Sequence, residues 1–228
     1  MESTSSFLDA LRNGLLSSEA VTKFSPNRRF SMLFSEGDPA ENMYYLDSGL
    51  VKLYKRNGEG KEIIIQIVAP GELFGEQALG ENGTRGMSAE ILHEGVLHVI
   101  PRVSFIQFCN ENPEHWHAVS ELLITRKREL EKKIELLCLQ DVEYRILFYL
   151  AELAGMFGVR NGEEFSVPLS QGELASLIGA TRETTSTTLN SLSRRGLIRL
   201  GRRQVILSSM DGVTAAAADR AAKAATTA

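Results

Sequence analysis

Ser170–Ser193, SQGELASLIGATRETTSTTLNSLS, is the stretch that decides the fold of the C-terminal part of the chain. Ser170 is a good helix N-cap, and Glu173 completes a capping box, in which each residue bonds the backbone N–H of the other. Gly179 ends this helix, because glycine adopts the left-handed conformation at little cost. Thr181 caps a second helix. The pattern predicts two helices that meet at a steep angle, a helix-turn-helix.

The second helix is expected to have one buried face and one polar face. The buried stripe is Thr185, Thr188, Leu189 and Leu192, and the polar face is Arg182, Glu183, Ser186, Thr187 and Asn190. Arginine donates two hydrogen bonds to guanine, glutamate accepts from cytosine or adenine, and hydroxyl groups bond bases or phosphates. This helix is therefore predicted to enter the major groove of DNA.

A hairpin follows the second helix. Leu197–Leu200 and Gln204–Leu207 predict two strands around Gly201-Arg202-Arg203, a wing with a basic tip. We include Arg202 and Arg203 among the DNA-binding residues, together with Thr181 and with Ser170 and Gln171 at the start of the first helix.

The charge is distributed unevenly. The net charge is −4, yet six arginines lie between Arg182 and Arg203 and are opposed only by Glu183. The acidic excess lies elsewhere, so this segment is expected to bind phosphate while the rest of the chain is repelled. The alternative is a solvated surface without a binding role.

The sequence before the helix-turn-helix changes texture several times. Residues 1–23 predict a short amphipathic lead-in, and residues 24–102 predict an antiparallel barrel or jelly roll of short strands. The expected strands are Met43–Leu46, Leu50–Tyr54, Ile63–Val68 and Val96–Ile100, and the expected turns include Asp47-Ser48-Gly49 and Pro70-Gly71.

Pro113 opens a long predicted helix, Glu114 to Leu139. Its apolar residues recur at alternating spacings of three and four, which favours a coiled-coil dimer seam, and the alternative is a helix packed on its own barrel. The seam is Trp116, Val119, Leu123, Lys127, Leu130, Ile134 and Leu137. Asp141 is a good N-cap for the next helix, Val142 to Met156, and we expect it to act as a hinge.

The fold class expected from these segments is α+β. It comprises an N-terminal antiparallel β-roll of the jelly-roll type, a long dimerisation helix and a C-terminal winged helix-turn-helix. The expected domains are residues 1–112 for the roll with its N-terminal helix, 113–140 for the dimerisation helix and 141–210 for the DNA-binding domain. Residues 211–228 are Ala- and Thr-rich; we expect a flexible tail, and the sequence leaves open whether it is a loose helix or disordered.

Several motifs in this order resemble the cAMP receptor protein/FNR family of bacterial regulators. They are Phe34–Ala40 leading to Met43–Leu46, Ser48–Leu53, Gly58–Glu62, Pro70–Glu76 and Gly179–Thr184. The resemblance covers about Phe24 to Leu207. It implies a homodimer, an effector-binding roll with a cyclic-nucleotide-binding fold, and a winged helix-turn-helix that reads a palindrome.

The resemblance also suggests roles for particular residues. Arg182 and Glu183 match a base-reading pair, and Ser186 matches the pattern of the FNR branch, so a half-site related to TGTGA or TTGAT is expected. In the roll, Phe74-Gly75-Glu76 and Arg85 resemble a phosphate-binding cassette. The expected effector-binding residues are Gly75, Glu76, Gln77, Arg85 and Gly86.

The identity of the effector stays open. The loop from Glu76 to Arg85 is one residue shorter than in the cAMP-binding prototype, and Leu130 and Glu131 replace the hydroxyls that contact adenine there. A cyclic nucleotide, another small effector such as cyclic di-GMP or 2-oxoglutarate, or no ligand remain alternatives. His115 or His117 would be candidate ligands for haem iron or zinc, although no metal site is assigned, and Cys109 and Cys138 would sense oxidation only if exposed and of low pKa.

The remaining classes of function are less well supported. No nucleophile–base pair, metal-ligand spacing or P-loop indicates an enzyme, and no apolar run approaches the ~18 residues that span a bilayer. A nucleotide-binding signalling module, whose helix-turn-helix serves dimerisation, is the second hypothesis. The N-terminus lacks a secretory signal. We therefore expect a cytoplasmic transcription regulator, effector-gated or constitutive, whose partners are palindromic double-stranded DNA, a second copy of itself and RNA polymerase.

Overall fold

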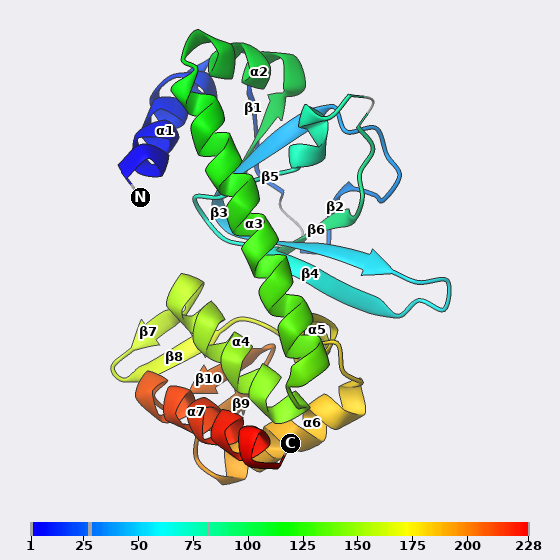
Figure 1. Ribbon diagram of the computed structural model, residues 1–228, viewed down its shortest axis with the longest axis vertical. Helices are drawn as coiled ribbons and strands as arrows, with labels where there is room; N and C mark the ends of the chain where they lie inside the picture. The colour runs from blue at the N-terminus through cyan, green and yellow to red at the C-terminus, as the bar shows by residue number, and fades with distance from the viewer. Residues whose placement is uncertain (1, 27–28, 82, 228) are drawn as a thin grey trace. The chain divides into compact units, whose positions relative to one another are not determined.

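The computed structural model describes residues 2–26, 29–81 and 83–227 (Figure 1). The chain divides into two compact units. One contains Met1–Lys55 and Ile65–Leu130, and the other contains Arg56–Ile64 and Glu131–Ala228. This division falls within the long helix and so precedes the boundary expected near Gln140, whereas the three-domain division of the sequence remains a prediction.

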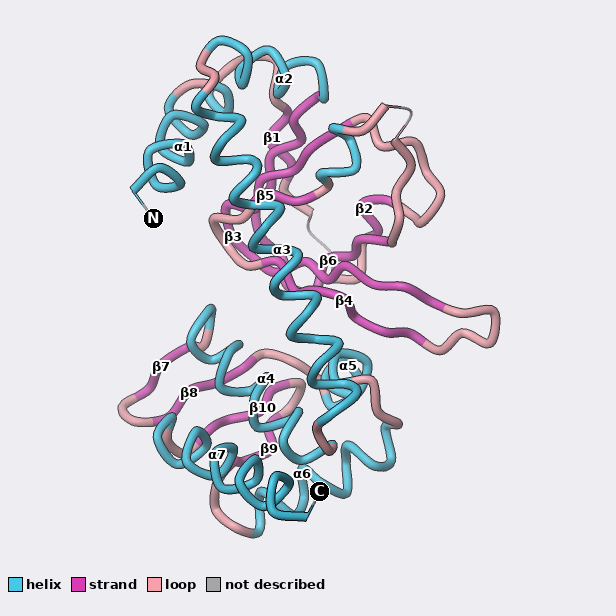
Figure 2. Tube along the Cα trace, viewed as in Figure 1, coloured by secondary structure: helices cyan, strands magenta, loops and turns pink. Residues whose placement is uncertain are grey.

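The first unit begins with a helix, continues through an antiparallel sheet and ends on two helices (Figure 2). Its elements, with two short 3-10 helices named η and with part of β3, β4 and α3 shared with the second unit, are α1 (Glu2–Asn13), η1 (Leu15–Ser17), β1 (Thr22–Phe24), β2 (Met32–Phe34), β3 (Asn42–Arg56), β4 (Glu62–Val68), β5 (Leu73–Phe74), η2 (Glu76–Leu79), β6 (Ser88–Pro101), α2 (Arg102–Glu111) and α3 (Glu114–Leu139).

The sheet is the predicted antiparallel β-roll. Its strand order is β1-β6-β3-β4, with β2 added on β6 and β5 on β3. The expected turn at Asp47–Gly49 is wrong, because Met43–Leu46 and Leu50–Tyr54 belong to the single strand β3. The turn residues instead produce register shifts against β6 on either side of Ser48, which are β-bulges.

Two apolar clusters fill this unit. One lies inside the roll and includes Phe34, Tyr44 and Phe74, whose rings are 5.1 to 6.5 Å apart between centroids. The other joins α1 and α2 to the roll and includes Phe7, Leu11 and Phe105, each with at most 4% of its surface exposed. The amphipathic lead-in predicted from the sequence is therefore the helix α1, which buries its apolar face.

Helix α3 has the predicted bounds but presents a different stripe to solvent. Val119 is buried in its own unit, and Leu137 is only partly exposed. Leu123, Leu130 and Ile134 are 43%, 44% and 61% exposed, so these three predicted seam residues form an apolar stripe on the surface of the isolated chain.

The second unit is the predicted winged helix-turn-helix, extended by a further helix. Its elements beyond α3 are α4 (Val142–Phe157), β7 (Val159–Asn161), β8 (Glu164–Val167), α5 (Gln171–Ile178), α6 (Arg182–Arg194), β9 (Ile198–Gly201), β10 (Gln204–Leu207) and α7 (Met210–Thr227). A small antiparallel sheet with the order β7-β8-β10-β9 adjoins the helices. Its core includes Leu147, Leu150, Leu174 and Leu189, all fully buried.

The segment expected to be a flexible tail forms the helix α7. Alanine-rich sequence has the highest helix propensity, and Val213 is fully buried, so this helix packs on α4 rather than standing alone. Arg220 adds an ion pair of 2.6 Å to Asp141, the N-cap of α4. The sequence pattern alone did not separate helix from disorder here, because the contacts that hold α7 come from distant residues.

Candidate nucleic-acid interface

The predicted capping box holds the start of α5. Ser170 Oγ accepts from the Glu173 N–H at 3.2 Å, and Glu173 Oε2 accepts from the Ser170 N–H at 2.6 Å. At the other end Gly179 is left-handed, with φ +66°, and the Ala180 N–H closes the turn on the Ala175 carbonyl at 3.1 Å. These bonds fix the angle at which the next helix leaves the turn.

Helix α6 is fixed by its own cap and by its buried side. Thr181 Oγ1 accepts from the Thr184 N–H at 3.1 Å, as predicted for a helix cap. Thr185, Leu189 and Leu192 are fully buried. Thr188 differs from the prediction: its hydroxyl donates to the Thr184 carbonyl at 2.9 Å and its side chain is partly exposed, because a polar group bonded to its own helix gains little from burial.

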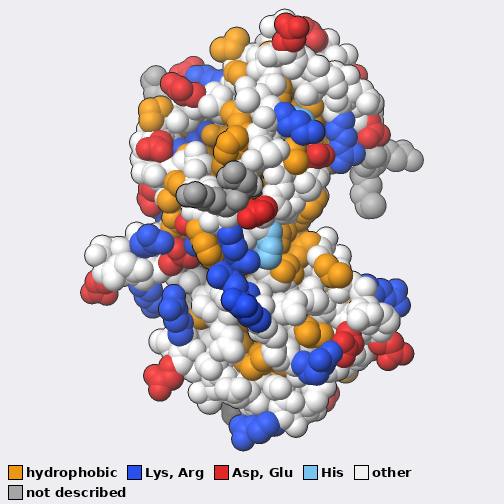
Figure 3. All heavy atoms as spheres, turned by 180° about the vertical axis from the view of Figure 1, so that it is seen from behind, with side chains coloured by type: hydrophobic (Ala, Val, Ile, Leu, Met, Phe, Trp, Pro, Cys, Tyr) orange, Lys and Arg blue, Asp and Glu red, His pale blue; other side chains and the backbone are white. Residues whose placement is uncertain are grey.

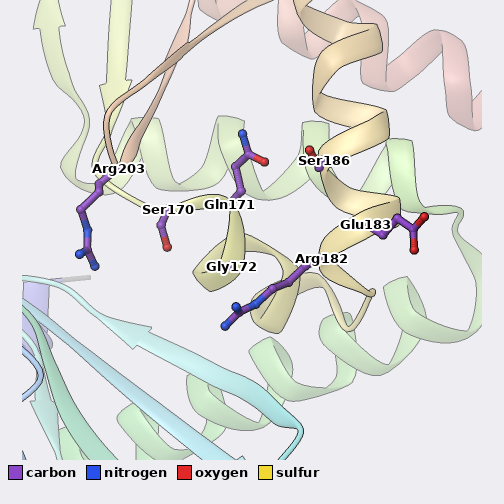
Figure 4. A pocket seen from close by; sticks show the side chains of 7 residues that line it. All are labelled: Ser170, Gln171, Gly172, Arg182, Glu183, Ser186 and Arg203. Atoms are coloured by element: carbon purple, nitrogen blue, oxygen red, sulfur yellow. The ribbon is translucent and has the colours of Figure 1, made fainter.

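A hollow in the surface brings most of the predicted DNA-binding residues together (Figure 4). It lies among the starts of α5 and α6 and the wing turn, and its lining is Ser170, Gln171, Gly172, Arg182, Glu183, Ser186 and Arg203. Three segments separated in the sequence thus present donors and acceptors to one space. Figure 4 shows the Arg182 guanidinium directed toward the start of α5 and the Glu183 carboxylate directed away from it.

Gly172 was not singled out from the sequence, and it shapes this hollow. A Cβ atom at Gly172 would lie 3.4 Å from Arg182 Nε and 3.5 Å from Cζ, so the guanidinium packs over the bare backbone of α5. No pattern in the sequence marks this contact, because it depends on the angle between the two helices.

The other predicted DNA-binding residues lie beside the hollow rather than in it. Thr187 and Asn190 are exposed on α6, and Arg202 is exposed in the wing turn. Arg203 is left-handed, with φ +59°, a conformation that non-glycine residues seldom adopt. It lies 3.7 Å from Glu173 Oε1, which connects the wing to the first turn of α5.

The arginines of this segment are less uniformly available than their number suggests. Arg195 pairs with Glu143 at 2.6 Å, and Arg199 pairs with Glu164 at 2.5 Å, which raises the pKa of the Arg199 guanidinium. Within the described part of the chain, Arg182, Arg194 and Arg202 have no ion pair. Acidic and basic side chains are likewise interspersed on the face shown in Figure 3. The prediction that only Glu183 opposes the arginines is therefore wrong, because carboxylates distant in sequence neutralise two of them.

Asp141 occupies the predicted cap position before α4. Its Oδ1 accepts from the Tyr144 N–H at 2.9 Å, and its Oδ2 accepts from Arg220 Nε at 2.6 Å. One carboxylate thus connects the start of α4 to α7. Its role as a hinge remains a prediction.

In the roll, the residues that were expected to bind an effector surround a buried guanidinium. Arg85 is 2% exposed and donates to the carbonyls of Gly75 at 3.0 Å and Asn42 at 2.6 Å. Its Cζ lies 4.2 Å from the centre of the Phe34 ring, and its Nε is buried without a hydrogen-bond partner. Burial lowers the pKa of Arg85. Within the described residues, no carboxylate lies within ion-pair distance of it.

The neighbours of Arg85 fit a cradle only in part. Gly75 is left-handed, with φ +84°, and a Cβ there would lie 2.8 Å from Arg85 Nη1. Glu76 accepts from Gln77 Nε2 at 3.0 Å, and Gly86 is exposed. The structure therefore brings Gly75 and Arg85 into contact, while Glu76 and Gln77 bond to each other.

The histidine and cysteine alternatives receive little support. His115 stacks on Phe108 with 4.4 Å between ring centroids and is buried. Among the described residues, no group of three or more His, Cys, Asp or Glu side chains is arranged to hold a metal ion. Cys109 is buried, and burial raises its thiol pKa to about 11, whereas Cys138 is exposed. Cys109 thus lacks both properties required of an oxidation sensor.

The fold and this surface define a transcription regulator with a C-terminal winged helix-turn-helix. The cyclic nucleotide-binding domain model matches residues 26–112, and the Crp-like helix-turn-helix domain model matches residues 144–215. These matches, with the relatives below, show that the chain belongs to the cAMP receptor protein/FNR family of sequence-specific DNA-binding transcription regulators.

Named relatives span most of the chain. It is 32% identical over 181 residues to the CRP-like cAMP-activated global transcriptional regulator of Mycobacterium tuberculosis, covering 78% of this chain and 81% of the relative. It is 31% identical over 169 residues to the cyclic AMP receptor protein of Thermus thermophilus, covering 74% and 76%. The crystal structure of a CRP-family transcriptional regulator, also from Thermus thermophilus, superposes with a TM-score of 0.74 at 27% identity, covering 86% and 96%.

Proposed function

We propose that this chain regulates transcription as a homodimer that reads a palindromic operator, with α6 in the major groove. The observation that carries this proposal is the hollow in which Arg182, Glu183 and Ser186 of α6 converge with the start of α5 and the wing turn. Arg182 and Glu183 contact base edges in the proposed complex, whereas Ser170, Gln171 and Arg203 contact the phosphates on either side.

The remaining predicted residues extend this contact along the groove. Ser186 and Thr187 lie one turn further along α6 than Arg182 and Glu183, and Asn190 lies one turn beyond. Arg202 at the tip of the wing supplies a charge to the adjacent backbone. Thr181 caps the helix, and its main role is to fix the start of α6.

The exposed stripe on α3 supports dimerisation. Leu123, Leu130 and Ile134 would remain in water in an isolated chain, and burying such a stripe against a second copy is favourable. A two-fold dimer places one reading helix in each of two successive major grooves, about 34 Å apart. The operator is therefore an inverted repeat.

Selection of bound sequences from a random duplex library tests this proposal. The expected result is a palindrome with half-sites separated by about 10 base pairs between their centres. Enrichment of a single unrepeated motif would contradict the dimer, and failure to enrich any sequence would contradict sequence-specific reading. Sedimentation of the protein alone and with the selected duplex measures whether two chains bind one site.

A second proposal concerns the roll: Arg85 binds a small anionic effector. The supporting observation is that this buried guanidinium has no carboxylate at ion-pair distance within the described residues and keeps one nitrogen without a partner. A phosphate group would supply the missing charge, and the name of the Mycobacterium tuberculosis relative states activation by cAMP. Cyclic nucleotide chemistry therefore leads the alternatives. The other is a constitutive regulator, in which backbone carbonyls alone satisfy Arg85.

Calorimetry distinguishes the two alternatives. Titration with cAMP, cyclic GMP and cyclic di-GMP is expected to give heat with at least one ligand, and that ligand is expected to change the affinity for the selected duplex. The conservative Arg85→Lys variant is expected to lose this heat while keeping its DNA affinity without ligand. No heat with any of the three would contradict a cyclic nucleotide effector and favour constitutive DNA binding.

A further inference from the structure

The end of α5 is held by two buried cations that come from other helices. Lys133 Nζ, on α3, donates to the Leu177 carbonyl at 2.7 Å. Arg145 Nη1, on α4, donates to the Ile178 carbonyl at 2.7 Å. These carbonyls belong to the last two residues of α5, where backbone acceptors lack partners within the helix and the helix dipole favours positive charge.

Lys133 is an unusual residue for this position because its charge is buried without a carboxylate. It is 5% exposed, and its nearest side-chain oxygen is Tyr149 Oη at 3.5 Å. Burial, and then the charge of Arg145, lower its pKa to about 8. Within the described residues neither Lys133 nor Arg145 has an ion pair, so the two like charges are compensated by helix carbonyls.

A buried charge of this kind contributes poorly to stability. An apolar side chain of similar length would fill the same space without the cost of removing an ammonium group from water. What the ammonium adds is a directed hydrogen bond to one carbonyl. The geometry of Lys133 is therefore better suited to fixing the position of α5 than to stabilising the fold.

The turn after α5 is also in contact with α3. A Cβ atom at Gly179 would lie 2.7 Å from Leu137 Cδ2, so only glycine allows the last turns of α3 to approach this closely. Lys133 and Leu137 are one helical turn apart on α3, on the same face. The same face of α3 thus contacts both the end of α5 and the turn that leads to the reading helix.

Little flexible chain separates this contact from the DNA-reading residues. Only Gly179, Ala180 and Thr181 lie between Ile178 and Arg182, and Ala180 and Thr181 are both hydrogen-bonded in caps. A shift of the α5 end is therefore passed to α6 rather than absorbed in the turn.

We infer that Lys133, assisted by Arg145, is a positioning residue for DNA reading, which fixes α5 and hence the direction of α6 relative to α3 and α4. This inference rests on the proposed function, in which α6 reads base edges. It also gives α3 a direct means of altering sequence reading, because its final turns hold the helix-turn-helix by a bond that can be made or broken.

The test compares specific with non-specific DNA affinity in the full-length chain. Fluorescence anisotropy measures binding to the selected palindrome and to a random duplex of equal length, for wild type, Lys133→Met and Lys132→Met. Lys132 is the matched control, since it is the preceding residue on α3 but pairs at the surface with Glu135 at 2.8 Å.

Lys133→Met is expected to weaken palindrome binding by about tenfold or more, the equivalent of losing a charged hydrogen bond. Random-duplex affinity and its salt dependence are expected to stay within about twofold of wild type, because they depend on exposed charges. Lys132→Met is expected to keep the wild-type ratio of palindrome to random-duplex affinity.

Other outcomes separate the inference from the proposed function. Wild type that shows no preference for the palindrome would contradict the proposed function. Wild type with a preference that Lys133→Met retains, or a loss that is equal on both duplexes, would overturn the positioning role. If circular dichroism shows that Lys133→Met does not fold, Arg145→Gln is measured in its place, and an unchanged ratio in that variant overturns the inference.

Discussion

Replacing Arg182 by alanine tests the reading face with little effect on the fold. Arg182 is exposed on the first turn of α6, and within the described residues it makes no ion pair. Its guanidinium touches the backbone of Gly172 and little else that is buried. The unfolding transition of Arg182→Ala is therefore expected to stay close to that of wild type, so any loss of affinity reports the DNA contact.

The size of that loss follows from the proposed contact. A bidentate arginine–guanine pair contributes about 1–3 kcal/mol of discrimination, so a dimer with two half-sites loses about 2–6 kcal/mol on its operator. Random DNA offers no fixed guanine at this position, so Arg182→Ala loses there only the effect of one positive charge per chain. The ratio of specific to random affinity is expected to fall by at least about tenfold.

Arg194→Ala is the matched control, since Arg194 is also exposed on α6 without an ion pair in the described chain but lies at its far end. It removes the same charge, and its specificity ratio is expected to stay within about twofold of wild type. The assay is anisotropy titration on the selected palindrome and on a random duplex, at several salt concentrations. If Arg182→Ala and Arg194→Ala weakened both duplexes equally, the assignment of Arg182 as a base reader would be refuted.

Three further predictions address stability and assembly. Because burial lowers the pKa of Lys133 to about 8, the unfolded chain binds this proton more tightly, and the free energy of unfolding should rise by about 1 kcal/mol between about pH 7 and 9; denaturant titrations should show no such rise from this residue in Lys133→Met, and an identical pH profile would contradict the buried charge. Ile134→Glu should leave the folded chain intact, because the side chain is 61% exposed, but should produce monomers in sedimentation equilibrium; a persistent dimer would exclude the α3 stripe. Val213→Ala should cost about 1–3 kcal/mol of unfolding free energy while exposed Thr214→Ala costs less, and equal, negligible effects would show that α7 is not packed in solution.

The helix-turn-helix was predictable because its signals are local and agree with one another. The capping box of Ser170 and Glu173, the left-handed Gly179 and the cap Thr181 each depend on residues at most three positions away. The apolar spacing of α6 agreed with them, although Thr188 proved to bond its own helix. Consistent local signals of this kind are what makes a segment predictable.

Other features depend on contacts between distant residues. Glu143 and Glu164 neutralise Arg195 and Arg199 across sequence separations of 52 and 35 residues, which a count of charges cannot show. The turn signal at Asp47–Gly49 was overridden by pairing of β3 with β6, which absorbs the extra residues as bulges.

The faces of α3 illustrate the same limit. The spacing of its apolar residues predicted a seam that included Leu137, but Leu137 and Lys133 turn toward the helix-turn-helix. A stripe of Leu123, Leu130 and Ile134 remains exposed. Periodicity marked the apolar positions correctly, whereas their assignment to an internal or an external partner required the positions of α5 and of the roll. The structure also has no helix, among those described, that is long and apolar enough to cross a bilayer.

The central claim is that the hollow around Arg182 reads a palindrome in a dimer of this chain. Its most direct test is the affinity of the purified protein for the selected palindrome, for the same duplex with one half-site scrambled, and for random sequence at ~0.15 M salt. The palindrome is expected to bind about a thousandfold or more tighter than random DNA, with two chains per duplex, and the scrambled half-site is expected to remove most of that difference. Equal affinity for all three duplexes would contradict the account.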